Sequence, residues 1–137
     1  DRYIEHEVID LCGEMGLGIV PFSPLAQGLL TGKYRQGQPA PAGSRGTFQP
    51  DLQAQLVPEN FEKIDTLTKM AAELDTDLAT FALAWDKRDS RISSLIIGAS
   101  KPEQLKNNLK AVDLEIPAEY EARIDKLFGF KKFFREI

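Results

Sequence analysis

The stretch that decides the fold is residues 93–108, which have the sequence SSLIIGASKPEQLKNN. It opens with the apolar run Leu95-Ile96-Ile97, which predicts a strand buried on both faces. A glycine turn follows, and then Ser100 and Glu103 have the spacing of a capping box, in which each side chain bonds a free backbone N–H at a helix start. Pro102 suits the first turn of that helix, where no donor is needed. The pattern therefore predicts a buried strand that leads directly into a helix N-terminus.

Such a helix start attracts anions. Its unpaired N–H groups and the positive end of the helix dipole favour negative charge, and Lys101 adds a full positive charge beside them. A phosphate group suits this arrangement. An ordinary turn between a strand and a helix, with a solvated lysine, explains the same residues equally well.

Composition sets the outer limits. A chain of 137 residues with 42% hydrophobic content suits one globular domain with a real core. A net charge of −4 argues against a nucleic-acid binder, and neither an apolar run of membrane-spanning length nor a signal peptide is found. One cysteine, Cys12, fits a reducing compartment and predicts a cytoplasmic protein. The chain begins within a helical pattern and without methionine, which suggests a piece of something longer.

The order of predicted elements indicates an α/β protein. Apolar spacing predicts a helix over residues 1–15 that ends at Gly16, followed by a short buried strand over 17–22. A long loop is expected over 34–58, then helices over 61–74 and 78–85, and a last helix from Pro117. Asp75 or Thr76 is the expected cap of the helix at 78–85, and the mixed charges at 86–91 predict a solvated turn. Because two parallel strands leave both edges unpaired, we expect them to belong to a larger sheet.

The segment 22–34 is a second informative stretch, apolar yet rich in glycine, proline and serine. An apolar loop after a strand often faces a ligand, with Phe22 as a flat aromatic surface, Ser23 as a polar anchor and Lys33 as a partner for an anion. Simple core packing is the alternative. In the long loop that follows, Arg45 is either a phosphate clamp, a lid latch or a solvated charge.

These motifs resemble a known family. Residues 18–34, GIVPFSPLAQGLLTGKY, and residues 96–105, IIGASKPEQL, together with Asn108, closely resemble the C-terminal part of the aldo-keto reductases. Within that family the chain is most similar to bacterial members related to potassium channel beta subunits and to glyceraldehyde-3-phosphate or methylglyoxal reductases. The resemblance covers essentially the whole chain, so residues 1–137 are interpreted as the C-terminal portion of such a domain.

The resemblance implies a (β/α)8 TIM barrel that uses NADPH to reduce aldehydes and ketones to alcohols without a metal ion. This chain would hold the last two strands, 17–22 and 94–97, with their helices. The family's catalytic Asp, Tyr, Lys and His would lie in the earlier strands, so no residue here is assigned a catalytic role. The implied partners are a small carbonyl substrate and the remainder of the barrel or a self-association partner, with neither nucleic acid nor membrane.

The resemblance also implies a set of NADP(H)-binding residues. One group lies along the nicotinamide and pyrophosphate, with Phe22 as the stacking aromatic where the family more often has Tyr or Trp, followed by Ser23, Pro24, Leu25, Ala26 and Gly28. A second group, Lys33 and Arg45, belongs to the lid over the cofactor. A third group meets the adenosine 2′-phosphate and adenine: Gly98, Ser100, Lys101, Gln104 and Asn108. A hydroxyl and a charge facing a dianion favour NADP over NAD.

Other noticeable residues are expected to be structural. Trp85 and Cys12 are interpreted as core residues and His6 as a surface residue. The aromatic and basic tail, residues 128–137, is expected to pack back on the body, with coverage of the substrate mouth or a membrane surface as alternatives.

The leading hypothesis is the cofactor-binding segment of an NADPH-dependent aldo-keto reductase, inactive alone. An NADPH-sensing regulatory subunit is the alternative, and a freestanding domain that oligomerises through its open edges is a third possibility.

Overall fold

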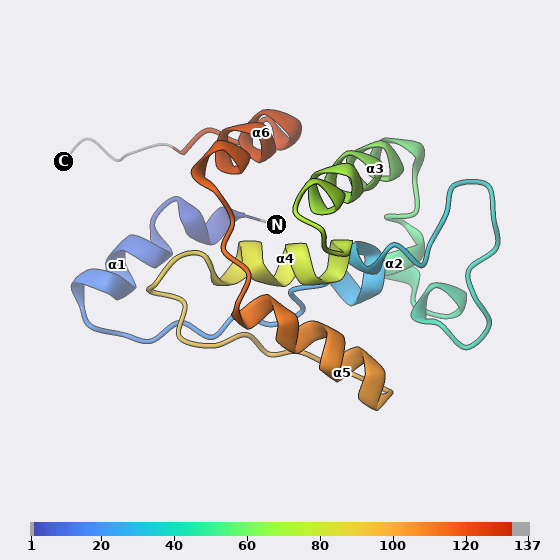
Figure 1. Ribbon diagram of the computed structural model, residues 1–137, viewed down its shortest axis with the longest axis horizontal. Helices are drawn as coiled ribbons and strands as arrows, with labels where there is room; N and C mark the ends of the chain where they lie inside the picture. Colours follow the sequence, from blue (N-terminus) through green and yellow to red (C-terminus); the bar gives the residue numbers. More distant parts are fainter. Residues whose placement is uncertain (1, 133–137) are drawn as a thin grey trace.

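The computed structural model describes residues 2–132, and within that range the regular structure is helical (Figure 1). The 3-10 turns are η1 (Tyr3–Glu5), η2 (Ala26–Thr31), η3 (Arg45–Thr47) and η4 (Lys110–Val112). The α-helices are α1 (Val8–Glu14), α2 (Pro50–Gln53), α3 (Pro58–Glu73), α4 (Leu78–Lys87), α5 (Pro102–Leu109) and α6 (Ala118–Phe128).

Helix α4 forms the centre of the molecule. Every residue from Leu78 to Trp85 is buried, which is the pattern of a helix that is apolar on all sides and enclosed by other elements. Its N-cap is Asp77, whose carboxylate accepts a hydrogen bond from the N–H of Thr80 at 3.0 Å. The prediction that Asp75 or Thr76 caps this helix is wrong. Asp75 instead adopts a left-handed backbone conformation, with φ 52°, at the end of α3.

The main core lies between α3, α4 and α6. Figure 1 shows these helices gathered around the middle of the molecule, and the predicted helices at 61–74, 78–85 and after Pro117 are confirmed. The largest side chains of this core come from all three helices: Phe61, Ile64, Leu67, Met70, Leu78, Phe81, Trp85, Tyr120 and Ile124.

The predicted α/β fold, with the last two strands of a (β/α)8 barrel, is wrong for this structure. No strand forms in residues 2–132. The segments expected at 17–22 and 94–97 meet at one isolated parallel bridge, Phe22 with Ile96, and a second bridge joins Ile19 to Ile92, just before the second segment. We refer to these paired segments, residues 17–22 and 92–97, as the ribbon. Across the described chain no third segment extends the pairing, and a lone pair of short segments has little stability as a sheet.

The ribbon is also not buried on both faces. Leu95 and Ile97 turn inward, where they pack beside Leu83 and Ala84 of α4. On the other face Val20 and Ile96 are each more than half exposed. The sequence pattern of a fully buried strand therefore predicts one more covering layer than the described residues supply.

The N-terminal helix and the long loop also differ from expectation. The predicted helix at 1–15 is divided into η1 and α1, although Gly16 has the expected left-handed φ of 66° and the Leu17 N–H bonds the Cys12 carbonyl at 2.8 Å, as in a Schellman motif. The segment 34–58 is not irregular throughout, because η3 and α2 form within it.

The predicted solvated turn at 86–91 is wrong, because its charges are part of a packed network. The Arg88 guanidinium lies 3.5 Å from the centre of the Trp85 ring and donates to Glu5 at 2.9 Å. Arg2 donates to the same Glu5 carboxylate at 2.7 Å. Trp85 is 9% exposed, so its assignment to the core is confirmed.

The described part of the tail, residues 129–132, packs back on the body as expected. Phe130 stacks on His6 with ring centres 5.0 Å apart, and the Lys132 ammonium lies 2.9 Å from the Asp10 carboxylate. His6 is consequently half-buried rather than on the surface, and Cys12 is half-buried rather than in the core. Residues 133–137 of the predicted tail lie outside the described residues.

Candidate functional site

The two ends of the ribbon lead to the same edge of the molecule. Phe22 is bridged to Ile96, and the Ile96 N–H donates to the Pro21 carbonyl at 2.9 Å. Because the two segments run parallel, the loop after Phe22 and the turn through Gly98 leave the pair in the same direction. The phenyl ring of Phe22 is 78% exposed at this exit. The structure thus brings the two predicted binding stretches together and leaves an aromatic face open beside them.

The loop after Phe22 is a series of tight turns with backbone strain. Ser23, Ala26 and Gln27 all have positive φ values, of 55°, 46° and 59°, in a region that side chains with a Cβ seldom adopt. Hydrogen bonds from Ala26 N–H to Ser23 O at 2.8 Å and from Gly28 N–H to Leu25 O at 2.9 Å hold the turns. Strain of this kind often accumulates in ligand-binding loops. Ser23 is exposed, whereas Pro24, Leu25 and Ala26 are partly buried.

Lys33 lies over Gly28. A Cβ placed on Gly28 would come within 2.8 Å of both Cε and Nζ of Lys33, and Gly28 also has a φ of 100°. A glycine at this position therefore lets the lysine ammonium approach the backbone of the 23–28 loop closely. The predicted lid residue Lys33 and the predicted pyrophosphate loop are thus brought together.

Arg45 is brought to the same region through a separate contact. The Gly46 N–H donates to the hydroxyl of buried Tyr34 at 3.1 Å, which joins the residues that directly follow Arg45 and Lys33. The Gln53 side chain holds this turn by donating to the Gly46 carbonyl at 3.0 Å. The Arg45 side chain remains exposed.

The start of α5 differs in detail from the predicted capping box. The N-cap is Lys101, so Ser100 lies one residue outside the helix. Gln104, at the third helical position, accepts hydrogen bonds from the Ser100 N–H at 2.8 Å and the Ser100 hydroxyl at 3.1 Å. Glu103 makes no cap, and the reason is that Pro102 occupies the first helical position and moves the box by one residue. Ser100, Lys101 and Gln104 are all exposed beside Gly98.

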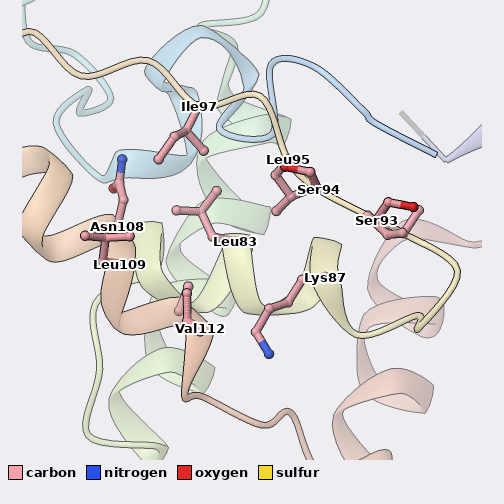
Figure 2. A pocket seen from close by; sticks show the side chains of 11 residues that line it. Leu83, Lys87, Ser93, Ser94, Leu95, Ile97, Asn108, Leu109 and Val112 are labelled. Atoms are coloured by element: carbon pink, nitrogen blue, oxygen red, sulfur yellow. The ribbon is translucent and has the colours of Figure 1, made fainter. Parts of the chain in front are cut away.

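Asn108 is in a different environment from the other predicted residues of α5. It is 7% exposed and lines a cavity of about 400 Å³ between the ribbon, α4 and the turn after α5. Figure 2 shows it with Leu83, Leu95 and Ile97 around this cavity. The structure therefore separates Asn108 from the exposed surface that carries Lys101.

Sequence reasoning missed a polar network between α4 and α5. The Asp77 carboxylate accepts hydrogen bonds from the Thr80 hydroxyl at 2.9 Å and from the Asn107 side-chain amide at 2.9 Å. Burial opposes ionisation, but the hydrogen bonds from Thr80 and Asn107 outweigh it and lower the pKa of Asp77. One signal was available in the sequence, because an Asp directly before an apolar run, as at position 77, is typical of a helix N-cap.

The assembled side chains offer an aromatic face, hydroxyl groups, amides and positive charges. Groups of these kinds suit a flat, phosphate-bearing ligand, and the set contains no carboxylate or histidine for proton transfer. In residues 2–132 no group of three His, Cys, Asp or Glu side chains is placed to hold a metal ion. None of the described helices is long and apolar enough to cross a membrane.

Comparison with known families decides the relationship. Residues 1–128 match the model of the Aldo/keto reductase family. The chain belongs to this family. This confirms the resemblance drawn from the two motifs at 18–34 and 96–105.

Among curated aldo-keto reductase relatives, a probable voltage-gated potassium channel subunit beta of Oryza sativa subsp. japonica is 38% identical and covers 90% of this chain. An L-glyceraldehyde 3-phosphate reductase of Escherichia coli O157:H7 is 36% identical over 92% of the chain. An NADH-specific methylglyoxal reductase of Escherichia coli strain K12 is 30% identical over 85%. The chain spans only 38%, 38% and 35% of the length of these relatives, respectively.

A solved structure shows the same fold. The glycerol dehydrogenase of Gluconobacter oxydans superposes with a TM-score of 0.79 at 20% sequence identity, over 99% of this chain and 43% of its own. The arrangement of helices and ribbon in this aldo-keto reductase chain is therefore that of part of a larger known fold.

Proposed function

We propose that this chain is the NADP(H)-binding part of an aldo-keto reductase that reduces a small aldehyde or ketone to an alcohol. The observation that carries the proposal is the parallel pairing of Phe22 with Ile96, which directs the two predicted binding stretches to one edge. The cofactor, when bound, supplies a hydride to the carbonyl carbon.

The residues present fit such a cofactor. The exposed Phe22 ring gives the nicotinamide a stacking surface, although it lacks the hydrogen-bonding group of Tyr or Trp. The strained loop of Ser23, Pro24, Leu25, Ala26 and Gly28 lies along the pyrophosphate. Lys33, held over Gly28, and Arg45 supply positive charge above it.

The adenosine end is assigned to the start of α5. Ser100 and Lys101 offer a hydroxyl and a charge to the 2′-phosphate, while Gly98 lets the backbone approach and the exposed Gln104 lies toward the adenine. Asn108 is buried at the cavity beside the ribbon, so no contact with the adenine is assigned to it. No proton donor is assigned in this chain, so we expect it to bind the cofactor and to be inactive alone. A cytoplasmic location, and a carbonyl substrate as the partner, accompany this proposal.

Nucleotide titration tests the assignment. We expect the chain to bind NADPH more tightly than NADH, and Lys101→Ala to weaken NADPH binding about tenfold with less than about twofold effect on NADH, because one charge-assisted contact is removed. Lys69→Ala, which removes an exposed lysine from α3, is the matched control. Equal affinity for both nucleotides, or equal loss with both, contradicts the proposal.

A second candidate is an NADPH-sensing regulatory subunit. The 38% identity to a probable potassium channel subunit beta favours it. The two candidates differ in turnover, so NADPH consumption by the complete polypeptide with small aldehydes distinguishes them. Binding without consumption supports the sensor, whereas steady turnover supports the reductase.

A further inference from the structure

Helix α5 is supported almost entirely from its C-terminal end. Every residue from 98 to 106 is exposed, whereas Asn107 is half-buried and Asn108 is buried. Figure 1 shows the first turn of α5 at the outer end of the molecule, away from α4. A helix of eight residues is about 12 Å long, so the position of Lys101 at its start is set by contacts near Asn107.

The contacts at that supported end are the polar network of Asp77, Thr80 and Asn107. The Asn107 amide donates to Asp77 Oδ2 at 2.9 Å. The Thr80 hydroxyl lies 2.9 Å from the same carboxylate oxygen and 3.3 Å from the backbone carbonyl of Asn107. Thr80 is only 1% exposed, so water does not replace a lost partner easily. Together with the packing of Ala111 on Leu83 and Ala84, the network therefore holds the angle between α5 and α4.

We propose that Thr80 and Asn107 are positioning residues that set the preference for a nucleotide carrying a 2′-phosphate. The inference rests on the proposed function, in which the start of α5 holds that phosphate. A tilt of about 10° at Asn107 displaces the far end of the helix by about 2 Å, enough to break a charge-assisted hydrogen bond. The loop of Phe22 to Gly28 takes no part in these hydrogen bonds, because its Leu25 packs on the apolar cluster of Leu83 and Ala84. Its contacts with both nucleotides are therefore expected to be retained.

The test measures the ratio of the NADH and NADPH dissociation constants for the whole chain. For Thr80→Val and Asn107→Leu we expect this ratio to fall about fivefold or more, with a smaller loss of NADH affinity, because the phosphate contact at the far end of α5 moves farthest and Gln104, nearer to Asn107, moves less. Thr68→Val is the matched control. The Thr68 hydroxyl donates to a backbone carbonyl within α3 at 2.8 Å and makes no hydrogen bond to α5. Its ratio should remain that of the wild type.

A second pair of variants separates positioning from general damage. Thr80→Ser keeps the hydroxyl and should keep the ratio. The exchange of Asp77→Asn with Asn107→Asp retains an N-cap and a donor–acceptor pair, and it should restore the ratio lost in Asn107→Asp alone. If Thr80→Val does not fold by circular dichroism, the half-buried Asn107→Leu decides the question.

Two results overturn the inference. An unchanged ratio in folded Thr80→Val or Asn107→Leu does so, as does an equal loss of affinity for both nucleotides. The proposed function fails separately, when the wild-type chain itself binds neither nucleotide or shows no preference between them.

Discussion

The hydroxyl of Tyr34 accepts a hydrogen bond from the backbone N–H of Gly46 at 3.1 Å and closes the loop that carries Lys33 and Arg45. The contact requires glycine at position 46. A Cβ there would lie 2.6 Å from the Tyr34 ring and 3.0 Å from the Ala40 Cβ, with no room to move because Tyr34 is buried.

Gly46→Ala should therefore lower the free energy of unfolding by about 2 kcal/mol, the usual cost of overpacking a buried contact. Urea denaturation followed by tryptophan fluorescence measures it. Gly98→Ala is the control, because its Cβ would enter open space, and it should change the unfolding free energy by less than about 0.5 kcal/mol. Similar urea unfolding midpoints for the two variants would show that crowding against Tyr34 does not destabilise the protein.

The carboxyl group of Asp86 should make the stability of the folded protein depend on pH. Burial raises the pKa of this carboxyl to about 7, although the positive charge of Arg88 acts in the opposite direction. The folded state therefore binds the proton more tightly than the unfolded state, and stability is lost as the pH rises from about 4 through 7.

Asp86→Asn removes this loss. It should raise the free energy of unfolding by about 2 kcal/mol at pH 8 and change it little at pH 4, where the wild-type side chain is already neutral. Urea unfolding at the two pH values provides the measurement. A gain of the same size at both pH values would point to a cause other than ionisation.

The carboxyl group of Glu73 should make stability depend on pH in the opposite direction. Its carboxylate accepts hydrogen bonds from Arg123 at 2.6 and 2.9 Å and from the Tyr120 hydroxyl at 2.9 Å, and these bonds lower the pKa of Glu73 to about 2. The pairing between α3 and α6 is then fully present above about pH 4.5 and is lost as the pH falls toward 2.

Glu73→Gln should accordingly lower the melting temperature at pH 7, and its difference from the wild type should disappear near pH 2. Glu62→Gln, an exposed change on the same helix, should leave the melting temperature unchanged at both pH values. A deficit in Glu73→Gln that persists at pH 2 would assign the effect to packing.

Helices α3, α4, α5 and α6 were predictable from sequence because each carries its own local signal, whereas α2 was missed and the helix predicted at 1–15 is divided. The apolar spacing of Phe61, Ile64 and Leu67 is sufficient to place α3, and Pro102 is sufficient to place the start of α5. The cap of α4 was missed because Asp75, Thr76 and Asp77 are all good caps, and only the left-handed turn at Asp75 selects Asp77.

The strands were not predictable in the same way, because strand formation depends on partners distant in sequence. The apolar run Leu95-Ile96-Ile97 has the composition of a doubly buried strand, but residues 2–132 supply only the partner at 19–22 and one covering layer. The polar network of Asn107 was missed for a related reason, since it joins residues 30 positions apart.

The sequence places most of the candidate residues in two continuous stretches, and the structure brings these stretches together through the pairing of Phe22 with Ile96. What the sequence did not reveal is how the lid residues are placed. The Lys33 side chain lies close to Gly28 because glycine has no Cβ, and Arg45 is positioned by the hydrogen bond from the neighbouring Gly46 N–H to Tyr34. Both relationships depend on three-dimensional packing.

Phe22 offers the sharpest separation of binding from stability. Because its ring is 78% exposed, it contributes little to the core, and Phe22→Ser should change the free energy of unfolding by less than about 0.5 kcal/mol. Loss of a stacking surface worth about 1 kcal/mol should weaken the binding of NADPH and NADH equally, by about fivefold, since the nicotinamide is common to both. Phe48→Ser, which removes another exposed phenyl ring, should leave both affinities unchanged. Fluorescence titration with each nucleotide measures these effects, and a loss confined to NADPH would place Phe22 at the adenosine end and reverse the proposed direction of the cofactor.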